Sequence, residues 1–188
     1  MNGNLYTLLS SGFPADRLSL CIEAHDGVNF TWQDVDAMTG RIANLLAALD
    51  LPRGARVAAQ VEKSPEALML YLATLRAGYT YLPLNTAYQS SEVDYFLGDA
   101  EPSVVVCSSK NLPWVGASAA KAGTGHVFTL DDDHTGSLLD AARSHADSFD
   151  TVAVTDDDLA AILYTSGTTG RSKGAMLTHD NLLSNALT

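Results

Sequence analysis

Residues 56–84 read RVAAQVEKSPEALMLYLATLRAGYTYLPL, and this stretch predicts a strand, a helix and a second strand in direct succession. Its first six residues are mostly apolar, as in a buried strand. Ser64 and Pro65 are typical of a helix N-cap and first turn, and Gly78 is typical of a helix end. The apolar middle part is then a buried helix, and the last six residues resume an extended conformation. Such a unit joins two parallel strands by a right-handed crossover.

The same alternation of strands and helices continues on both sides of this unit. Upstream, residues 31–50 place apolar side chains at helical spacing, and Thr31 with Asp34 makes a variant of the capping box. The further helices are predicted at 91–99, 113–122 and 137–149, and the further strands at 103–107 and 126–130. This order predicts an α/β fold, with a mostly parallel sheet flanked by helices.

The composition is that of a globular protein with an excess of acidic groups. The chain has 188 residues, which fits one domain, and 46% of them are hydrophobic. Its 22 acidic and 11 basic residues give a formal charge of -11, which argues against binding to nucleic acid. Charged residues interrupt every candidate for the roughly 20-residue apolar stretch of a membrane span. We therefore expect neither a nucleic-acid partner nor a membrane partner.

The cysteines and the acidic runs have structural interpretations. Cys21 and Cys107 are isolated and lack metal-ligand spacing, so we predict two reduced core thiols in a cytoplasmic protein. The N-terminus lacks the positive start and the apolar block of a signal peptide. The acidic runs 131–133 and 156–158 stand next to turn residues and are predicted to be solvated loops or helix N-termini. Metal binding at these runs is the less favoured alternative.

A polar loop near the end of the chain has the composition of a phosphate-binding site. Residues 164–174 read YTSGTTGRSKG. Glycines let the backbone approach an anion, successive N–H groups form an anion nest, hydroxyl groups donate, and Lys173 supplies a positive charge. The apolar run 159–164 is predicted to be a strand buried on both faces of the parallel sheet. Residues 175–178 look extended, so the loop is predicted to join two strands.

Two common nucleotide-binding motifs are excluded by the spacing of this loop. In the Walker pattern the lysine follows a glycine and precedes Ser or Thr, whereas here Lys173 follows Ser172 and precedes Gly174. The glycine fingerprint of dinucleotide-binding folds does not follow any predicted strand. On composition alone, a polar surface turn therefore remains the alternative to a phosphate site.

The sixteen residues 164–179, YTSGTTGRSKGAMLTH, resemble the AMP-binding signature of the adenylate-forming superfamily of acyl-CoA synthetases and luciferase-like enzymes. Other blocks similar to that family are VAAQ at 57–60, PEA at 65–67, ATLRAG at 73–78 and YLPLN at 81–85. Within the family, three blocks look most like malonyl-CoA synthetases: EKSPEA at 62–67, LNTAY at 84–88 and DYF at 94–96. The resemblance covers nearly all of the chain.

The resemblance implies an ATP-dependent, AMP-forming ligase that works in two steps. A carboxylic acid, here malonate or methylmalonate, attacks the α-phosphate of ATP with Mg²⁺ screening the charge, and coenzyme A then displaces AMP to form a thioester. By similarity, seven residues would hold the β- and γ-phosphates of ATP: Thr165, Ser166, Gly167, Thr168, Thr169, Gly170 and Lys173. Arg171 is a weaker candidate, Tyr164 is predicted to pack at the base of the loop, and a capping or packing role is favoured for His179.

The resemblance also implies that residues 1–188 are the N-terminal part of the large AMP-binding domain, whose C-terminal remainder is absent from this sequence. The family's adenine, ribose and Mg²⁺ motifs, its C-terminal lysine and its acyl-recognition residues would lie beyond Thr188. No catalytic residue and no metal ligand is therefore assigned in this stretch, which we expect to be inactive alone. The oligomeric state stays open. Two alternative functions also stay open: a ligase of the same superfamily for another carboxylic acid, and a non-catalytic nucleotide-binding module.

Overall fold

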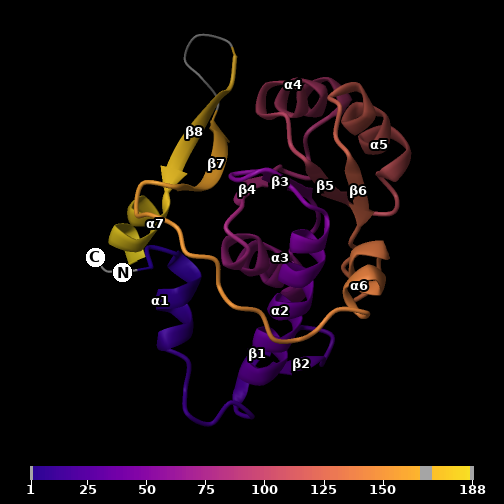
Figure 1. Ribbon diagram of the computed structural model, residues 1–188. Coiled ribbons are helices and arrows are strands. Elements are labelled where there is room, and N and C mark those ends of the chain that lie inside the picture. Colours follow the sequence, from indigo (N-terminus) through magenta and orange to yellow (C-terminus); the bar gives the residue numbers. More distant parts are fainter. Residues whose placement is uncertain (1, 166–170, 187–188) are drawn as a thin grey trace.

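The computed structural model describes residues 2–165 and 171–186, which form a six-stranded sheet with helices on both faces and a separate two-stranded hairpin (Figure 1). In chain order the elements are α1 (Leu5–Ser11), β1 (Leu20–Glu23), β2 (Asn29–Thr31), α2 (Trp32–Ala48), β3 (Arg56–Gln60), α3 (Pro65–Arg76), β4 (Thr80–Pro83), α4 (Ser90–Ala100), β5 (Val104–Cys107), α5 (Leu112–Lys121), β6 (His126–Thr129), α6 (Ser137–Ala142), β7 (Leu159–Thr165), β8 (Lys173–Thr178) and α7 (His179–Ala186).

The central sheet has the strand order β6-β5-β3-β4-β7-β8. Neighbouring strands from β6 to β7 are parallel, and β8 is antiparallel to β7. The predicted strand-helix-strand unit is β3, α3 and β4, with Val57 opposite Tyr81 in the register. Since β5 pairs with the other edge of β3, the chain passes over β3 between β4 and β5. The structure confirms the predicted α/β fold with a mostly parallel sheet.

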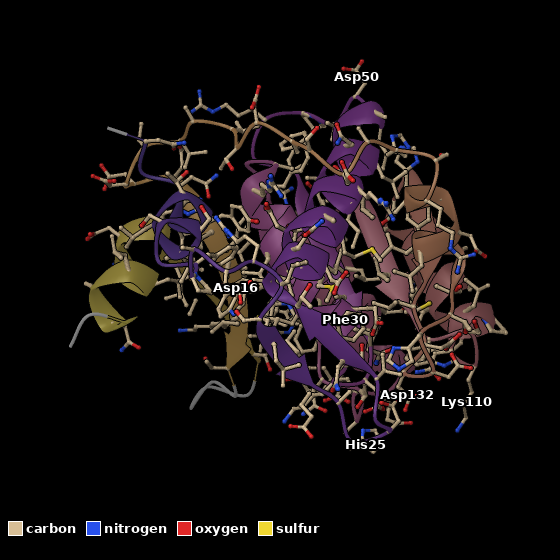
Figure 2. All side chains as sticks on the ribbon, turned by 90° about the horizontal axis from the view of Figure 1, so that it is seen from below. Asp16, His25, Phe30, Asp50, Lys110 and Asp132 are labelled. Atoms are coloured by element: carbon tan, nitrogen blue, oxygen red, sulfur yellow. The ribbon has the colours of Figure 1, made fainter. Side chains whose placement is uncertain are left out.

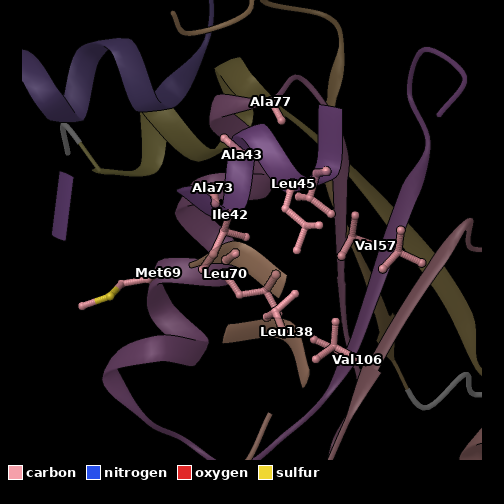
Figure 3. Close-up of a cluster of buried hydrophobic side chains, with 14 of the residues drawn as sticks. Ile42, Ala43, Leu45, Val57, Met69, Leu70, Ala73, Ala77, Val106 and Leu138 are labelled. Carbon is pink, nitrogen blue, oxygen red and sulfur yellow. The ribbon is translucent and has the colours of Figure 1, made fainter. Parts of the chain in front are cut away.

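The two faces of the sheet are covered by different helices. On one face, Val57 and Val106 pack in a cluster with side chains from α2, α3 and α6. The helix residues of this cluster include Ile42, Leu70 and Leu138 (Figure 3). On the other face, Ala58 and Val105 pack against α4 and α5. Because β3 and β5 are buried on both faces, residues 57–59 of β3 and all of β5 are apolar and do not alternate with polar residues.

Two predicted helix starts are confirmed by their hydrogen bonds. At the start of α2, Thr31 Oγ1 accepts from the Asp34 N–H at 3.1 Å, and the Thr31 N–H donates to the Asp34 carboxylate at 2.8 Å. At the start of α3, Ser64 Oγ accepts from the Ala67 N–H at 3.1 Å. The chain leaves α3 through Gly78, whose φ of +76° lies in the left-handed region that glycine adopts without strain.

The predicted helix 137–149 is wrong after its first six residues, because α6 ends there. The following chain runs irregularly across α2 and α3. The Asn44 side chain donates to the carbonyl oxygen of Ala146 at 2.8 Å, and Arg76 Nη2 donates to that of Phe149, also at 2.8 Å. A continued helix would use such carbonyl groups within its own ladder, so these tertiary hydrogen bonds override the helical pattern.

The first 31 residues hold three elements that the sequence pattern did not predict: α1 and the β1–β2 hairpin. α1 has seven residues, β1 four and β2 three. Their stability comes from contacts with distant parts of the chain. The Asn4 side chain, for instance, donates to the carbonyl oxygen of Leu75 at 2.7 Å.

The cysteines and the acidic runs can now be placed. Cys107 is fully buried in β5, whereas Cys21 is half-buried in β1 beside the core, so the prediction of a core thiol is wrong for Cys21. Both thiols are free, as predicted. The acidic runs 131–133 and 156–158 lie in loops, which confirms that prediction. Within the described ranges, every helix is too short or too polar to cross a lipid bilayer.

Replacing Gly40 by alanine should destabilise the fold. A Cβ atom at Gly40 would lie 1.9 Å from the carbonyl oxygen of Asp147, so α2 and the chain that crosses it would have to separate. Overpacking of this kind costs about 1–3 kcal/mol, which denaturant unfolding would measure. Gly98→Ala in α4 is the matched control: its added Cβ meets no atom within 4 Å, and helix propensity favours alanine there. Equal stability of Gly40→Ala and the wild type would contradict this close packing.

An ionic bridge of three residues joins the tip of the β1–β2 hairpin to α3. His134 Nε2 lies 2.7 Å from Asp26 Oδ2, and His134 Nδ1 lies 2.6 Å from Glu66 Oε1. Glu66 is buried in the first turn of α3, and Asp26 is in the hairpin turn; Figure 2 labels the neighbouring residues His25 and Asp132 on this side of the molecule. Hydrogen bonds to Asp26 and Glu66 raise the pKa of His134, because both favour the imidazolium form.

The His134 bridge should make stability depend on pH. A raised pKa means that the folded protein binds the proton more tightly than the unfolded chain does. The bridge therefore stabilises fully below the unfolded pKa of about 6.5, and its contribution is lost as pH rises through the folded pKa. His134→Asn should lower the melting temperature more at pH 6 than at pH 9. Asparagine is chosen because it tolerates the positive φ of this position.

The control for this experiment is His25→Asn, since the exposed His25 makes no ion pair with any described residue. It should leave the melting temperature nearly unchanged at both pH values. An equal loss of stability at both pH values in His134→Asn would show that the bridge does not act through the charge of the imidazolium.

Candidate functional site

The predicted phosphate loop lies at the tip of the β7–β8 hairpin. β7 ends at Thr165 and β8 begins at Lys173, and these two residues are opposite each other in the antiparallel register. The loop therefore joins two strands, as predicted. Because β7 runs parallel to β4, the loop follows the carboxyl end of a parallel strand, and α/β sheets bind ligands beyond these ends.

The structure describes two of the seven residues that were predicted to hold phosphates. Thr165 and Lys173 are exposed, and as directly opposed residues they point to the same face of the hairpin. The other five lie outside the described residues: Ser166, Gly167, Thr168, Thr169 and Gly170. Within the described part of the chain, no carboxylate pairs with Lys173. Its ammonium group is thus available to an anion, although the whole chain is acidic.

The strand β7 was predicted to be buried on both faces along its whole length, and this is wrong at its carboxyl end, where the loop begins. Residues 160–162 are buried, but the Leu163 side chain is 39% exposed and the strand is not covered on both faces there. The register pair of β7 with β4 is Tyr81 with Ala161, and the residues of β7 beyond it are paired with β8. Figure 1 shows β7 and β8 at one edge of the sheet, next to β4, with α4 on the side of the hairpin that carries the loop.

Tyr164 packs at the base of the loop, as predicted. Its ring lies against Phe96 of α4, with ring centroids 4.3 Å apart, and its hydroxyl donates to Asp99 Oδ2 at 2.5 Å. Burial and the hydrogen bond to Asp99 both raise the pKa of Tyr164. The phenol therefore stays protonated at neutral pH and remains the donor in this contact.

The residues directly before β8 also contact α4. The Tyr95 hydroxyl donates to the carbonyl oxygen of Ser172 at 2.9 Å, and the Arg171 guanidinium lies 5.9 Å from the centre of the Tyr95 ring. Sequence reasoning did not single out Tyr95 or Asp99 as part of this site. The available signal was their spacing of four residues in the predicted helix 91–99, which puts both side chains on one helix face.

His179 is a packing residue, in agreement with the favoured interpretation. It begins α7, is 1% exposed, and its Nδ1 accepts a hydrogen bond from the Leu5 N–H at 3.1 Å. Burial lowers the pKa of His179, so the ring is neutral and Nδ1 can act as the acceptor. The residue thus ties the segment after the hairpin to α1 at the start of the chain.

A polar cavity of about 680 Å³ opens where β3 and β4 end. Its lining includes the side chains of Lys63, Asn85, Thr86 and Asp132. These residues offer an ammonium, an amide, a hydroxyl and a carboxylate, so the cavity suits a polar ligand. It lies beyond the carboxyl ends of two parallel strands, as ligand sites of α/β sheets do.

Comparisons with known proteins agree with this arrangement. The family model of AMP-binding enzymes matches residues 10–188. The crystal structure of ATP-bound MatB from Rhodopseudomonas palustris is 55% identical with a TM-score of 0.93, and the match covers 100% of this chain and 37% of that chain. The apo structure of MatB from the same organism is 53% identical with a TM-score of 0.92, over 100% of this chain and 36% of that chain.

Curated relatives show the same family at lower identity. Long-chain-fatty-acid–CoA ligase FadD13 of Mycobacterium tuberculosis is 33% identical over 170 residues, which are 90% of this chain and 34% of that protein. Tyrocidine synthase 3 of Brevibacillus parabrevis is 31% identical over 177 residues, which are 93% of this chain and 2% of that protein. The chain thus spans about a third of the length of FadD13 and far less of the synthase. Since the family model matches almost the entire sequence, this chain belongs to the family of AMP-binding enzymes.

Proposed function

We propose that this chain provides the ATP phosphate-binding part of an AMP-forming acid–thiol ligase, which joins a carboxylic acid to coenzyme A through an acyl-adenylate. The observation that carries the proposal is the pair Thr165 and Lys173 at the neck of the hairpin loop. The two residues face the same side, both are exposed, and Lys173 has no acidic partner among the described residues. Membership of the AMP-binding enzyme family supports it.

In the first step, a carboxylate oxygen of the acid forms a bond to the α-phosphorus of ATP. The bond from that phosphorus to the bridging oxygen breaks, and pyrophosphate leaves with additional negative charge. The Lys173 ammonium and the Thr165 hydroxyl stabilise this charge, together with the predicted donors of 166–170. In the second step, the thiol of coenzyme A loses its proton to solvent and its sulfur forms a bond to the acyl carbon. The bond from that carbon to the phosphate oxygen breaks, and AMP leaves with this oxygen.

Mg²⁺ accompanies ATP in the proposed reaction, but no step is assigned to it. Within residues 2–165 and 171–186, no group of three or more His, Cys, Asp or Glu side chains could hold a metal ion.

The acyl substrate that we propose is malonate or methylmalonate. Two observations support it: the blocks 62–67, 84–88 and 94–96 resemble malonyl-CoA synthetases, and the chain is 53–55% identical to MatB, a malonyl-CoA synthetase. The names of FadD13 and tyrocidine synthase 3 show that relatives at 31–33% identity act on other substrates. A ligase for another carboxylic acid is therefore the second candidate, and a nucleotide-binding module without catalysis is the third.

Replacing Lys173 by alanine in the complete enzyme should slow adenylate formation. A charge-assisted contact to the leaving pyrophosphate disappears, and loss of one such contact costs about 2–4 kcal/mol of transition-state stabilisation. Exchange of labelled pyrophosphate into ATP measures this step. Lys121→Ala is the matched control, because it removes the same charge from an exposed surface pair with Asp94. Exchange at the wild-type rate in Lys173→Ala would refute the role assigned to Lys173.

A panel of acids tests the substrate. In the complete protein, thioester formation should be faster with malonate or methylmalonate than with a long-chain fatty acid or an amino acid, because the assignment rests on similarity to malonyl-CoA synthetases. Preference for another acid would remove the malonyl assignment and leave the ligase proposal intact. Binding of ATP without pyrophosphate release for any acid would instead favour the non-catalytic module.

A further inference from the structure

The helix α4 contacts both ends of the phosphate loop. Asp99 accepts the hydrogen bond of the Tyr164 hydroxyl, at the end of β7. One helical turn earlier, Tyr95 donates to the carbonyl oxygen of Ser172, directly before β8. The two contacts therefore hold the two sides of the hairpin, immediately before and immediately after the residues that were predicted to surround the phosphates.

Apolar side chains also join α4 to the hairpin. The Phe96 ring lies between Tyr95 and Asp99 in the helix and packs against Tyr164 at 4.3 Å. A Cβ atom at Gly174 would lie 2.9 Å from Ile162 Cγ2, so the hairpin itself is closely packed at this level. Phe96 is 2% exposed, which fixes α4 to the body of the sheet. The helix is thus a rigid support for the hairpin.

Near the loop, β7 is paired with β8. In the register between β4 and β7, Tyr81 is opposite Ala161, four residues before Thr165. Beyond it, the register pairs of β7 are those with β8. The direction in which Thr165 and Lys173 point therefore depends on the contacts of the hairpin with α4.

We infer that Tyr95 and Asp99 are positioning residues for the phosphate site: they hold the two ends of the loop so that Thr165 and Lys173 face the phosphates of ATP. Neither side chain touches the reacting atoms, and both act through Tyr164 and Ser172. This inference rests on the proposed function of the loop. It predicts an effect on the ATP-dependent step and none on the transfer of the acyl group to coenzyme A.

Tyr95→Phe in the complete protein tests the inference, because it removes one hydroxyl and keeps the ring. Loss of one net hydrogen bond should raise the KM and the Kd for ATP about fivefold. The rate of thioester formation from preformed acyl-adenylate should stay at the wild-type value. Tyr88→Phe is the matched control: its ring also packs on Phe96, and its hydroxyl has no hydrogen-bond partner among the described residues. It should leave the KM for ATP unchanged.

A pair of substitutions at Asp99 provides a second, independent test. Asp99→Leu removes the acceptor of the Tyr164 hydroxyl and should raise the KM for ATP as Tyr95→Phe does. Asp99→Asn keeps a side-chain oxygen at the same place and should remain close to the wild type. An unchanged affinity for ATP in both Tyr95→Phe and Asp99→Leu would overturn the inference, as would equal losses in both half-reactions.

Equilibrium binding separates this inference from the proposed function. If the wild type binds ATP but forms no adenylate with any acid, the ligase proposal fails, and the Kd values of Tyr95→Phe and Asp99→Leu still decide on positioning. If the wild type forms adenylate and the variants match it in KM and Kd, the ligase proposal stands and the positioning role falls. If the wild type does not bind ATP, both are wrong.

Discussion

The buried guanidinium of Arg76 is the interaction on which the arrangement of the chain around the sheet depends. Its Nη1 lies 3.0 Å from Asp36 Oδ1 in α2, its Nη2 donates to the carbonyl oxygen of Phe149, and its charge lies 4.8 Å from the centre of the Tyr6 ring. The residue is 7% exposed, and a cation so far from water is tolerated only when it is paired and hydrogen-bonded. Four segments of the chain, α1, α2, α3 and the stretch after α6, therefore meet at one side chain.

This meeting point determines where the hairpin begins. The chain after α6 crosses α2 and α3, and the Val152 N–H donates to the carbonyl oxygen of Arg76 at 2.9 Å. Shortly afterwards it enters β7, which pairs with β4 at Tyr81 and Ala161. At the far end of the hairpin, α4 holds Tyr164 and Ser172. The hairpin is thus fixed at its start through Arg76 and near its tip through α4, and the loop between these supports presents Thr165 and Lys173.

The sequence predicted the fold well where local and tertiary preferences agree. In residues 56–84, the buried strand, the N-cap at Ser64 and the stop at Gly78 are each favoured locally, and the sheet and the core favour the same conformations. The stretch 143–149 is the opposite case. Its side chains permit a helix, but Asn44 of α2 and Arg76 of α3 donate hydrogen bonds to its carbonyl groups. The residues near 143–149 in the sequence do not indicate these distant donors.

The sequence by itself determined the α/β class, the loop between two strands and the resemblance to AMP-binding enzymes, because all three depend on neighbouring residues. Apolar runs, caps and a sixteen-residue signature can be recognised without knowing what they touch. The tertiary structure alone decided that β7 lies between β4 and β8 in the sheet, and that Tyr95 and Asp99 contact the two sides of the hairpin. The two hydrogen bonds of α4 with the hairpin join residues separated by 65 or more positions, and only folding brings such residues within hydrogen-bond distance.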